Sequence, residues 1–183
     1  MQGEGTAGMD DHLLGIFQAE LRTQCDFVIR GAHQVNAALK DPDTSGIWFG
    51  LQAILISASN ASKLLWGAGS TDREAAELRE RRARLRASVG ITDESPLNSR
   101  RVRNSFEHFD DRIEKWFAKD ERHIYLGRNI GPPNMIHIEG QEPTHFGHFD
   151  PATSIVTFWD RSAELNPIVR EAEEILRRLE DDR

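Results

Sequence analysis

Apolar side chains recur at helical spacing over roughly the first two thirds of the chain. Between residues 10 and 40 they follow one face of a helix, at Leu13, Leu14, Phe17, Leu21, Phe27, Val28, Val35 and Leu39. Asp41-Pro42-Asp43 ends this helix, because proline cannot continue it and restrains the residue before it. Residues 46–67 are apolar on most faces, which predicts a second helix at the centre of the fold.

Two further helices are predicted between residues 72 and 119. Thr71 and Glu74 form a candidate capping box for a helix over residues 72–89. Ser95-Pro96 places a capping residue before a proline at the first helical position, which predicts a helix over residues 96–119. Its apolar positions form one core stripe: Val102, Phe106, Phe109, Ile113, Trp116 and Phe117.

The character of the sequence changes after residue 122, where glycine and proline become frequent. Between them lie short β-prone runs at 135–138, 145–149 and 155–159, which predict two to four strands in an antiparallel hairpin or meander. Asn166-Pro167 then starts a last helix that runs to about residue 181.

Together these patterns predict a mainly α protein. The expected fold is a helical bundle of about five helices with a small antiparallel β insertion, residues 123–159, before the last helix. Residues 1–9 are expected to form a flexible tail, and residues 10–183 a single domain.

Composition restricts the surroundings in which this fold works. The chain has 183 residues, a net charge of −7 and one cysteine, Cys25, so no intrachain disulfide can form. This fits a reducing cytoplasm, which is the compartment we expect. The most apolar stretch, residues 47–66, is interrupted by Gln52, Asn60 and Lys63 and suits a buried helix better than a membrane span. The acidic balance gives no general electrostatic case for nucleic-acid binding.

The clearest chemical signal is the segment Arg-Arg-Val-Arg-Asn-Ser-Phe-Glu-His-Phe-Asp-Asp, residues 100–111. It places a histidine, which can move a proton near neutral pH, close to an arginine, which can hold a phosphate. On the predicted helix, Asn104 and His108 are four residues apart and therefore neighbours, and the long side chain of Arg103 can swing toward His108. A polar ridge results, opposite the apolar stripe: Arg101, Asn104, His108, Asp111 and Lys115.

Arg103-Asn104-Ser105-Phe106-Glu107-His108 resembles the motif of the HEPN superfamily, an arginine followed by a polar residue and then by a histidine after four to six intervening residues. The resemblance is strongest over residues 97–117. It implies a bundle of four or five helices, usually a homodimer in which the two motif helices meet. It also implies a metal-independent endoribonuclease of the kind found in toxin–antitoxin, phage-defence or RNA-processing systems, without a cofactor.

The resemblance assigns a role to each matching residue. Arg103 would stabilise charge on the scissile phosphate, and His108 would act as general base toward the ribose 2′-OH or as acid toward the leaving oxygen. Asn104 would orient the histidine or a phosphate oxygen, and Arg100 and Arg101 would add cations for substrate binding. The products would carry 2′,3′-cyclic phosphate and 5′-hydroxyl ends, so the substrate partner would be RNA. A second copy of the chain and an antitoxin or other regulatory protein are the expected protein partners.

Two other interpretations of the same residues compete with the hypothesis of an enzyme. The motif ridge could pack a non-catalytic HEPN-like interaction module, or it could be the solvated face of an ordinary helix in an unrelated scaffold. The arginines within residues 79–86 could extend a basic surface toward RNA, but a salt-bridged helix face is favoured for them.

Other candidate groups have simpler interpretations. On strands, His145 and His148 point to opposite faces, so with His137 they are better explained by packing than by a metal site. Cys25 is interpreted as a small apolar filler. Four tryptophans are interpreted as core anchors: Trp48, Trp66, Trp116 and Trp159.

Overall fold

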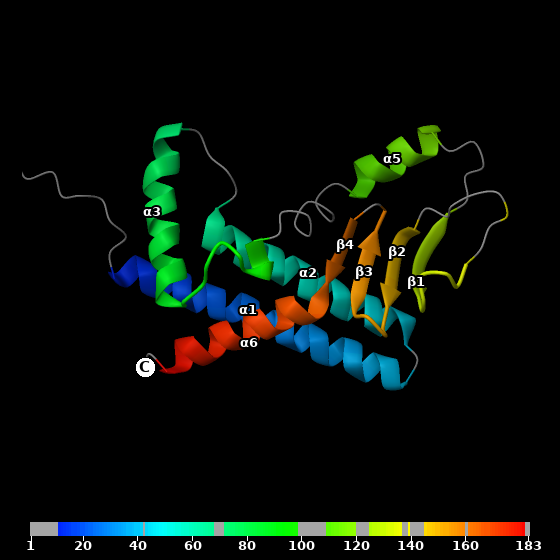
Figure 1. Ribbon diagram of the computed structural model, residues 1–183, viewed down its shortest axis with the longest axis horizontal. Helices are drawn as coiled ribbons and strands as arrows, with labels where there is room; N and C mark the ends of the chain where they lie inside the picture. Colours follow the sequence, from blue (N-terminus) through cyan, green and yellow to red (C-terminus); the bar gives the residue numbers. More distant parts are fainter. Residues whose placement is uncertain are drawn as a thin grey trace, which may run out of the picture.

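The protein is mainly α-helical, with a small four-stranded sheet before the last helix, as the sequence predicts (Figure 1). The computed structural model describes residues 11–41, 43–67, 72–98, 109–119, 125–136, 139, 145–159 and 161–181. The helices are α1 (Asp11–Lys40), α2 (Thr44–Trp66), α3 (Asp72–Ser88), the 3-10 turn η1 (Pro96–Asn98), α5 (Phe109–Lys119) and α6 (Leu165–Asp181). The strands are β1 (Leu126–Ile130), β2 (His145–Asp150), β3 (Ile155–Phe158) and β4 (Arg161–Glu164). The expected flexible tail, residues 1–9, and the candidate capping residue Thr71 lie outside the described residues.

The α1–α2 hairpin forms the centre of the fold. Gly31 and Gly50 let the two helices approach closely, because a Cβ on Gly50 would lie 2.7 Å from the Gly31 carbonyl oxygen. Nearer the other end of the hairpin, the Asn60 side-chain amide donates to Gln24 Oε1 at 3.3 Å. The buried side chains include Leu21, Val28, Leu51, Ile54 and Leu55. Small residues at the crossing and large ones beside it therefore produce one tightly packed pair of helices.

The last helix, α6, lies along α1 and completes the helical core (Figure 1). Five of its apolar residues recur every three or four positions and are buried: Leu165, Ile168, Ala172, Ile175 and Leu179. This spacing is that of an amphipathic helix with one face in the core, which the sequence predicts from about residue 166 onward.

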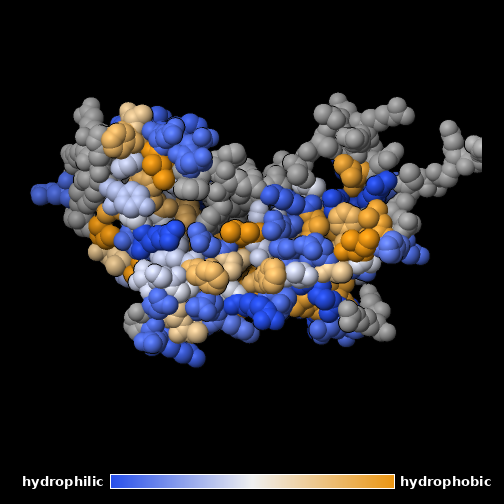
Figure 2. Space-filling view, turned by 180° about the vertical axis from the view of Figure 1, so that it is seen from behind, coloured by the Kyte–Doolittle hydropathy of each residue, from blue (hydrophilic) through white to orange (hydrophobic). Residues whose placement is uncertain are grey.

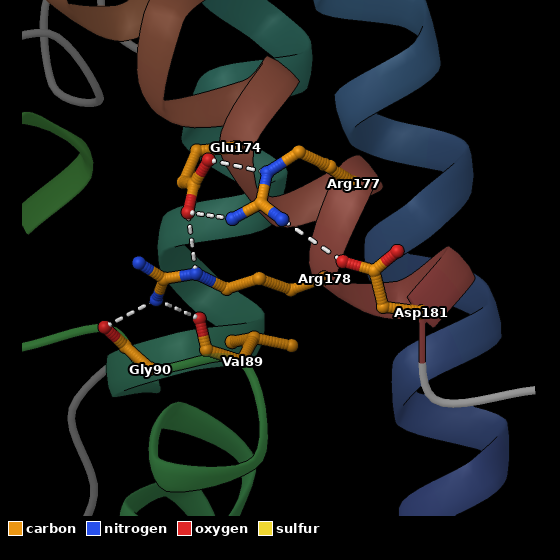
Figure 3. Close-up of polar contacts among 6 residues, drawn as sticks. All are labelled: Val89, Gly90, Glu174, Arg177, Arg178 and Asp181. Atoms are coloured by element: carbon orange, nitrogen blue, oxygen red, sulfur yellow. Dashed lines mark hydrogen bonds and ion pairs between the residues drawn. The ribbon is translucent and has the colours of Figure 1, made fainter.

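Polar contacts fix the exposed side of α6 to the end of α3 (Figure 3). Arg178 donates from Nη1 to the carbonyl oxygens of Val89 and Gly90, each at 2.7 Å, and from Nε to Glu174 Oε1 at 2.7 Å. Arg177 contacts the same carboxylate and also Asp181. Arg178 therefore supplies donors for carbonyls that follow the last turn of α3, where the helix itself offers none.

The sheet has the strand order β1-β2-β3-β4. Strands β2, β3 and β4 form the antiparallel meander that the sequence predicts, whereas β1 pairs with β2 in parallel. A parallel pair requires a crossover connection of about a dozen residues or more, and the chain between β1 and β2, residues 131–144, is long enough for one.

Two strands lie where the sequence pattern does not predict them. β1 precedes the predicted run at 135–138, of which Met135 and Ile136 belong to a turn region while residues 137–138 lie outside the described part. β4 extends the sheet to residue 164, past the predicted boundary at 159, and leads directly into α6. Both strands are short and lie at the edges of the sheet, where alternation of apolar residues is weak.

One face of the sheet packs on the helical hairpin. A Cβ on Gly147 would lie 2.9 Å from the ring of Trp48 on α2, and Trp48 meets Phe158 edge to face at a centroid distance of 5.9 Å. Phe149 and Val156 on the same face are buried in the common core. Alternation along β2 turns Phe146 and His148 to the other face, which is the side where α5 lies.

The four tryptophans differ in burial. Trp48 is buried, with 2% of its surface exposed, so it is the core anchor that the sequence predicts. Trp66, Trp116 and Trp159 are only half-buried, and the prediction is wrong for them in that respect. Among the described residues, no helix is both long enough and apolar enough to cross a membrane.

Candidate functional site

The motif segment lies between two described elements, η1 and α5. On its N-terminal side Leu97 is buried between α2 and α6. The Leu97 amide donates to Ser95 Oγ at 3.2 Å, and the Asn98 side-chain amide donates to the Asp93 carbonyl oxygen at 2.9 Å. Ser95 thus acts as the predicted cap, and the chain enters the motif segment from a fixed point on the bundle.

The residues predicted to do the chemistry lie outside the described part of the chain. They are Arg100, Arg101, Arg103, Asn104 and His108. The predicted helix over 96–119 is described only as a 3-10 turn at its start and as α5 at its end, and His108 directly precedes the first residue of α5. The structure therefore locates both ends of the segment, and the mutual geometry of Arg103 and His108 stays a prediction.

The apolar stripe of α5 is not the core stripe that the sequence predicts. Phe117 is 57% exposed and Ile113 is 37% exposed, whereas Trp116 is half-buried against the sheet. In the view from behind, hydrophobic and hydrophilic side chains adjoin over α5 at the upper left (Figure 2). The reason is that α5 lies beside the outer face of the sheet, apart from the α1–α2 core that would have covered the stripe (Figure 1).

Charges on α5 are divided between two edges of its apolar stripe. Arg112, Lys115 and Lys119 follow one another at spacings of three and four residues, so they share one edge, which we call the basic edge. Asp110 and Glu114 share the other edge, beside Ile113 and Phe117. All of these charged side chains are exposed except that of Arg112, which is half-buried.

An aromatic cluster joins α5 to the outer face of the sheet. Trp116 packs edge to face on Phe146, with ring centroids 4.6 Å apart and an interplanar angle of 89°. Tyr125 lies 4.5 Å from Phe146 and 6.4 Å from Trp116, between ring centroids. Trp159 lies 4.9 Å from Phe146, and the Arg112 guanidinium stands 5.5 Å from the centre of the Trp159 indole. The basic edge of α5 therefore adjoins the aromatic rings of the sheet.

Trp159 is held in this cluster by an uncommon backbone conformation. It lies in the two-residue connection between β3 and β4 and has a φ of +54°. Tight hairpin turns of this length favour positive φ, but glycine or asparagine usually occupies them. A tryptophan there costs about 1 kcal/mol or more, so the ring contacts must offset that strain.

Three arginines of α3, which are Arg82, Arg84 and Arg86, contact the bundle instead of forming an open basic surface. Arg82 donates to the carbonyl oxygen of Leu64 at 2.7 Å, and Arg86 donates to that of Leu65 at 2.6 Å. Arg84 pairs with Asp11. The Arg84–Asp11 pair fits the salt-bridged face favoured from the sequence. Arg82 and Arg86 in addition contact the last carbonyls of α2 and neutralise the partial negative charge of that helix end.

Two further candidates from the sequence, Cys25 and His148, are buried. Burial raises the pKa of the Cys25 thiol to about 12, and the charge of Glu171 adds to this, so Cys25 is the inert filler that the sequence predicts. His148 is buried, and it lowers the pKa of Asp150 only as the least of several causes, the first being the hydrogen bond from Thr153. Across the described ranges no group of three or more His, Cys, Asp or Glu side chains could hold a metal ion; His137 lies outside those ranges.

Tyr125 and Phe146 are the residues of this region that sequence reasoning missed. Neither belongs to the motif, and β1, which follows Tyr125, was not among the predicted strands. A usable signal exists in the high frequency of aromatic residues within 116–125 and 146–159, but only the sheet register shows that they meet.

Comparisons with family models, with curated proteins and with solved structures find no match to this chain. The functional interpretation therefore depends on its own residues and on the fold that carries them.

Proposed function

We propose that the protein is a metal-independent endoribonuclease of HEPN type that leaves 2′,3′-cyclic phosphate and 5′-hydroxyl ends, in a toxin–antitoxin or defence setting. The observation that carries the proposal is the sequence Arg103-Asn104-Ser105-Phe106-Glu107-His108 in a mainly α protein. Its position between a bundle-anchored turn and α5 supports the proposal, because both of its ends are held by ordered elements.

The proposed chemistry uses the RNA itself as the source of the nucleophile. His108 takes the proton of the ribose 2′-OH, the 2′ oxygen attacks the adjacent phosphorus, and the bond to the 5′ oxygen breaks. A second imidazole, the His108 of a partner copy, returns a proton to the leaving 5′ oxygen. Arg103 stabilises the charge that develops on the phosphate, and Asn104 holds the imidazole or a phosphate oxygen in place. Arg100 and Arg101 bind the flanking backbone.

A homodimer through the motif helix is part of the proposal, and α5 offers a surface for it. Ile113 and Phe117 are exposed on a helix with aspartates in its first turn and a lysine in its last. Two copies that pack antiparallel about a two-fold axis would cover Ile113 and Phe117 of both helices, so one apolar patch serves both copies. A protein antitoxin that controls the dimer is the further proposed partner.

The test is cleavage of a mixed RNA pool in EDTA. We expect the wild type to cleave, and His108→Ala and Arg103→Ala to lose at least about a hundredfold in rate, since positioned proton transfer contributes at least that much. His33→Ala and Arg79→Ala, which change exposed residues on α1 and α3, are the matched controls and should keep the wild-type rate. Cleavage that requires a divalent metal, or that survives both motif substitutions, would contradict the proposal.

A non-catalytic HEPN-like interaction module is the second candidate, and the exposed apolar residues of α5 favour it specifically. In that case a well-folded wild-type dimer leaves RNA intact, and His108→Ala and Arg103→Ala alter only the dissociation constant of the dimer. Sedimentation of the same variants, measured beside the cleavage assay, distinguishes the two candidates.

A further inference from the structure

The aromatic cluster on the outer face of the sheet presents one ring, Tyr125, that remains largely open to solvent near the basic edge of α5. Tyr125 is 60% exposed although its ring lies against both Phe146 and Trp116. The neighbouring rings thus fix its position from one side and leave the other side accessible. An exposed ring with a fixed orientation can stack on a flat ligand without first losing much conformational freedom.

Cations accompany these rings on one edge of α5. Trp116 lies four residues after Arg112 and three before Lys119, so it borders both, and Lys115 continues the same edge. Arg112 reaches over Trp159, which shows that this edge faces the sheet. Asp111 lies four positions before Lys115 and therefore borders this edge. Its single negative charge is outnumbered by the three cations, so the edge keeps an excess of positive charge.

The acidic residues of α5 lie mainly on the other edge. Asp110 and Glu114 border Ile113 and Phe117, where they would repel a phosphate, but they leave the side of Trp116 and Tyr125 to the cations. Rings beside lysines are the combination with which proteins bind single-stranded nucleic acid, because bases stack on the rings and the backbone lies along the positive charge. An unpaired strand is required, since the bases of a duplex already stack on each other.

We propose that Tyr125 and Trp116, together with Lys115 and Lys119, form a platform that binds an unpaired nucleotide of single-stranded RNA. This inference rests on the proposed ribonuclease function, for which it supplies the substrate class. α5 connects the platform to the motif: Trp116 lies about 10 Å along the helix axis from the first residue of α5, which His108 directly precedes. A strand that stacks on Tyr125 can therefore continue toward the motif segment.

The experiment measures fluorescence anisotropy of a labelled single-stranded DNA oligonucleotide of mixed sequence, in EDTA and low salt. This probe has no 2′-OH, so the proposed chemistry cannot cleave it and binding is measured by itself. We expect saturable binding that weakens about tenfold in Tyr125→Ala and recovers in Tyr125→Phe, because stacking needs the ring and not the hydroxyl. Lys119→Glu should weaken binding severalfold and reduce its dependence on salt.

Matched controls lie on the helical hairpin. Phe49, on α2, is 67% exposed, so Phe49→Ala removes an equally accessible ring, and Lys40→Glu reverses an exposed charge at the end of α1. Both variants should bind like the wild type. Equal weakening in Tyr125→Ala and Phe49→Ala, equal affinity for single strand and duplex, or absence of saturable binding would each overturn the platform. If Tyr125→Ala changed the mass of the assembly in solution but left oligonucleotide binding unchanged, the platform would be overturned in favour of a protein interface.

The two proposals fail in distinguishable ways. Binding that depends on Tyr125 together with intact RNA after incubation in EDTA would overturn the ribonuclease and leave the platform standing. Cleavage by the wild type together with unchanged oligonucleotide binding in Tyr125→Ala would overturn the platform and leave the ribonuclease standing.

Discussion

At the residue scale, single side chains and single missing side chains fix how the elements meet. Gly31 and Gly50 bring α1 and α2 together, and Arg178 connects α6 to the end of α3 (Figure 3). Sequence patterns indicate that both helices exist, but they do not show which glycine lies at a crossing. Gly15 on α1 looks the same in the sequence, yet a Cβ there would have no atom within 4 Å.

This contrast predicts opposite effects of the same substitution. Gly50→Ala should destabilise the protein by about 1–3 kcal/mol, because its Cβ would overlap the Gly31 carbonyl oxygen and Val35. Gly15→Ala should leave stability unchanged or raise it by up to about 1 kcal/mol, since alanine favours an exposed helix. Urea unfolding followed by circular dichroism measures both. Equal effects at the two positions would mean that the helices do not cross at Gly50.

Glu174 gives a pH dependence with a defined sign. Hydrogen bonds from Arg177 and Arg178 lower the pKa of its carboxyl from 4.5 to about 2. A pKa that is lower in the folded state contributes stability that is complete above about pH 4.5 and is lost as the pH falls toward 2. The difference in unfolding free energy between wild type and Glu174→Gln should therefore be larger at pH 7 than at pH 3.

The measurement is urea unfolding of both proteins at pH 7, 5 and 3. Glu173→Gln, which removes the same charge from an exposed neighbour on α6, is the matched control. Its difference from the wild type should change little between pH 7 and 3. A difference for Glu174→Gln that grows toward acid pH would contradict the predicted sign.

At the element scale, local signals fix where a helix begins and ends, but they do not fix which of its faces is exposed. The predicted bounds of α1, α2, α3 and α6 agree with the structure within about two residues, because caps, prolines and apolar periodicity are local signals. The predicted apolar stripe is present on α5, but the local sequence does not determine whether it is buried. Its burial depends on the position in which the sheet holds the helix. The same limit of local sequence information applies to Arg82 and Arg86. Only their contacts with the last carbonyls of α2 distinguish helix-capping arginines from a basic surface patch.

Removal of such a cap should affect the helix it caps. Arg86→Ala should destabilise the protein by about 1–3 kcal/mol, because the Leu65 carbonyl loses a charged donor. Amide hydrogen exchange should accelerate in the last turn of α2. Arg79, which is exposed on the same helix, provides the control, and Arg79→Ala should leave both quantities unchanged. Exchange that accelerates only in α3 would contradict a capping role.

At the scale of the whole molecule, sheet and helices share one core. Phe149 and Val156 of the sheet belong to the same buried cluster as the residues of α1, α2 and α6, and Trp48 lies at the junction. A domain with one core is expected to unfold cooperatively. The transitions followed by far-ultraviolet circular dichroism and by tryptophan fluorescence should therefore coincide in urea. A separate, earlier fluorescence transition would show that the sheet unfolds independently of the bundle.

The sequence by itself determined the helices, their order, the position of a β region before the last helix and the residues that carry candidate chemistry. Those features follow from periodicity, caps and side-chain type, which are properties of neighbouring residues. Only the tertiary structure decided that β1 joins the sheet in parallel, that α5 leaves part of its apolar stripe exposed, and that Tyr125 lies beside Trp116. Strand pairing and burial depend on contacts between residues far apart in the chain, and no local pattern specifies which of these segments meet.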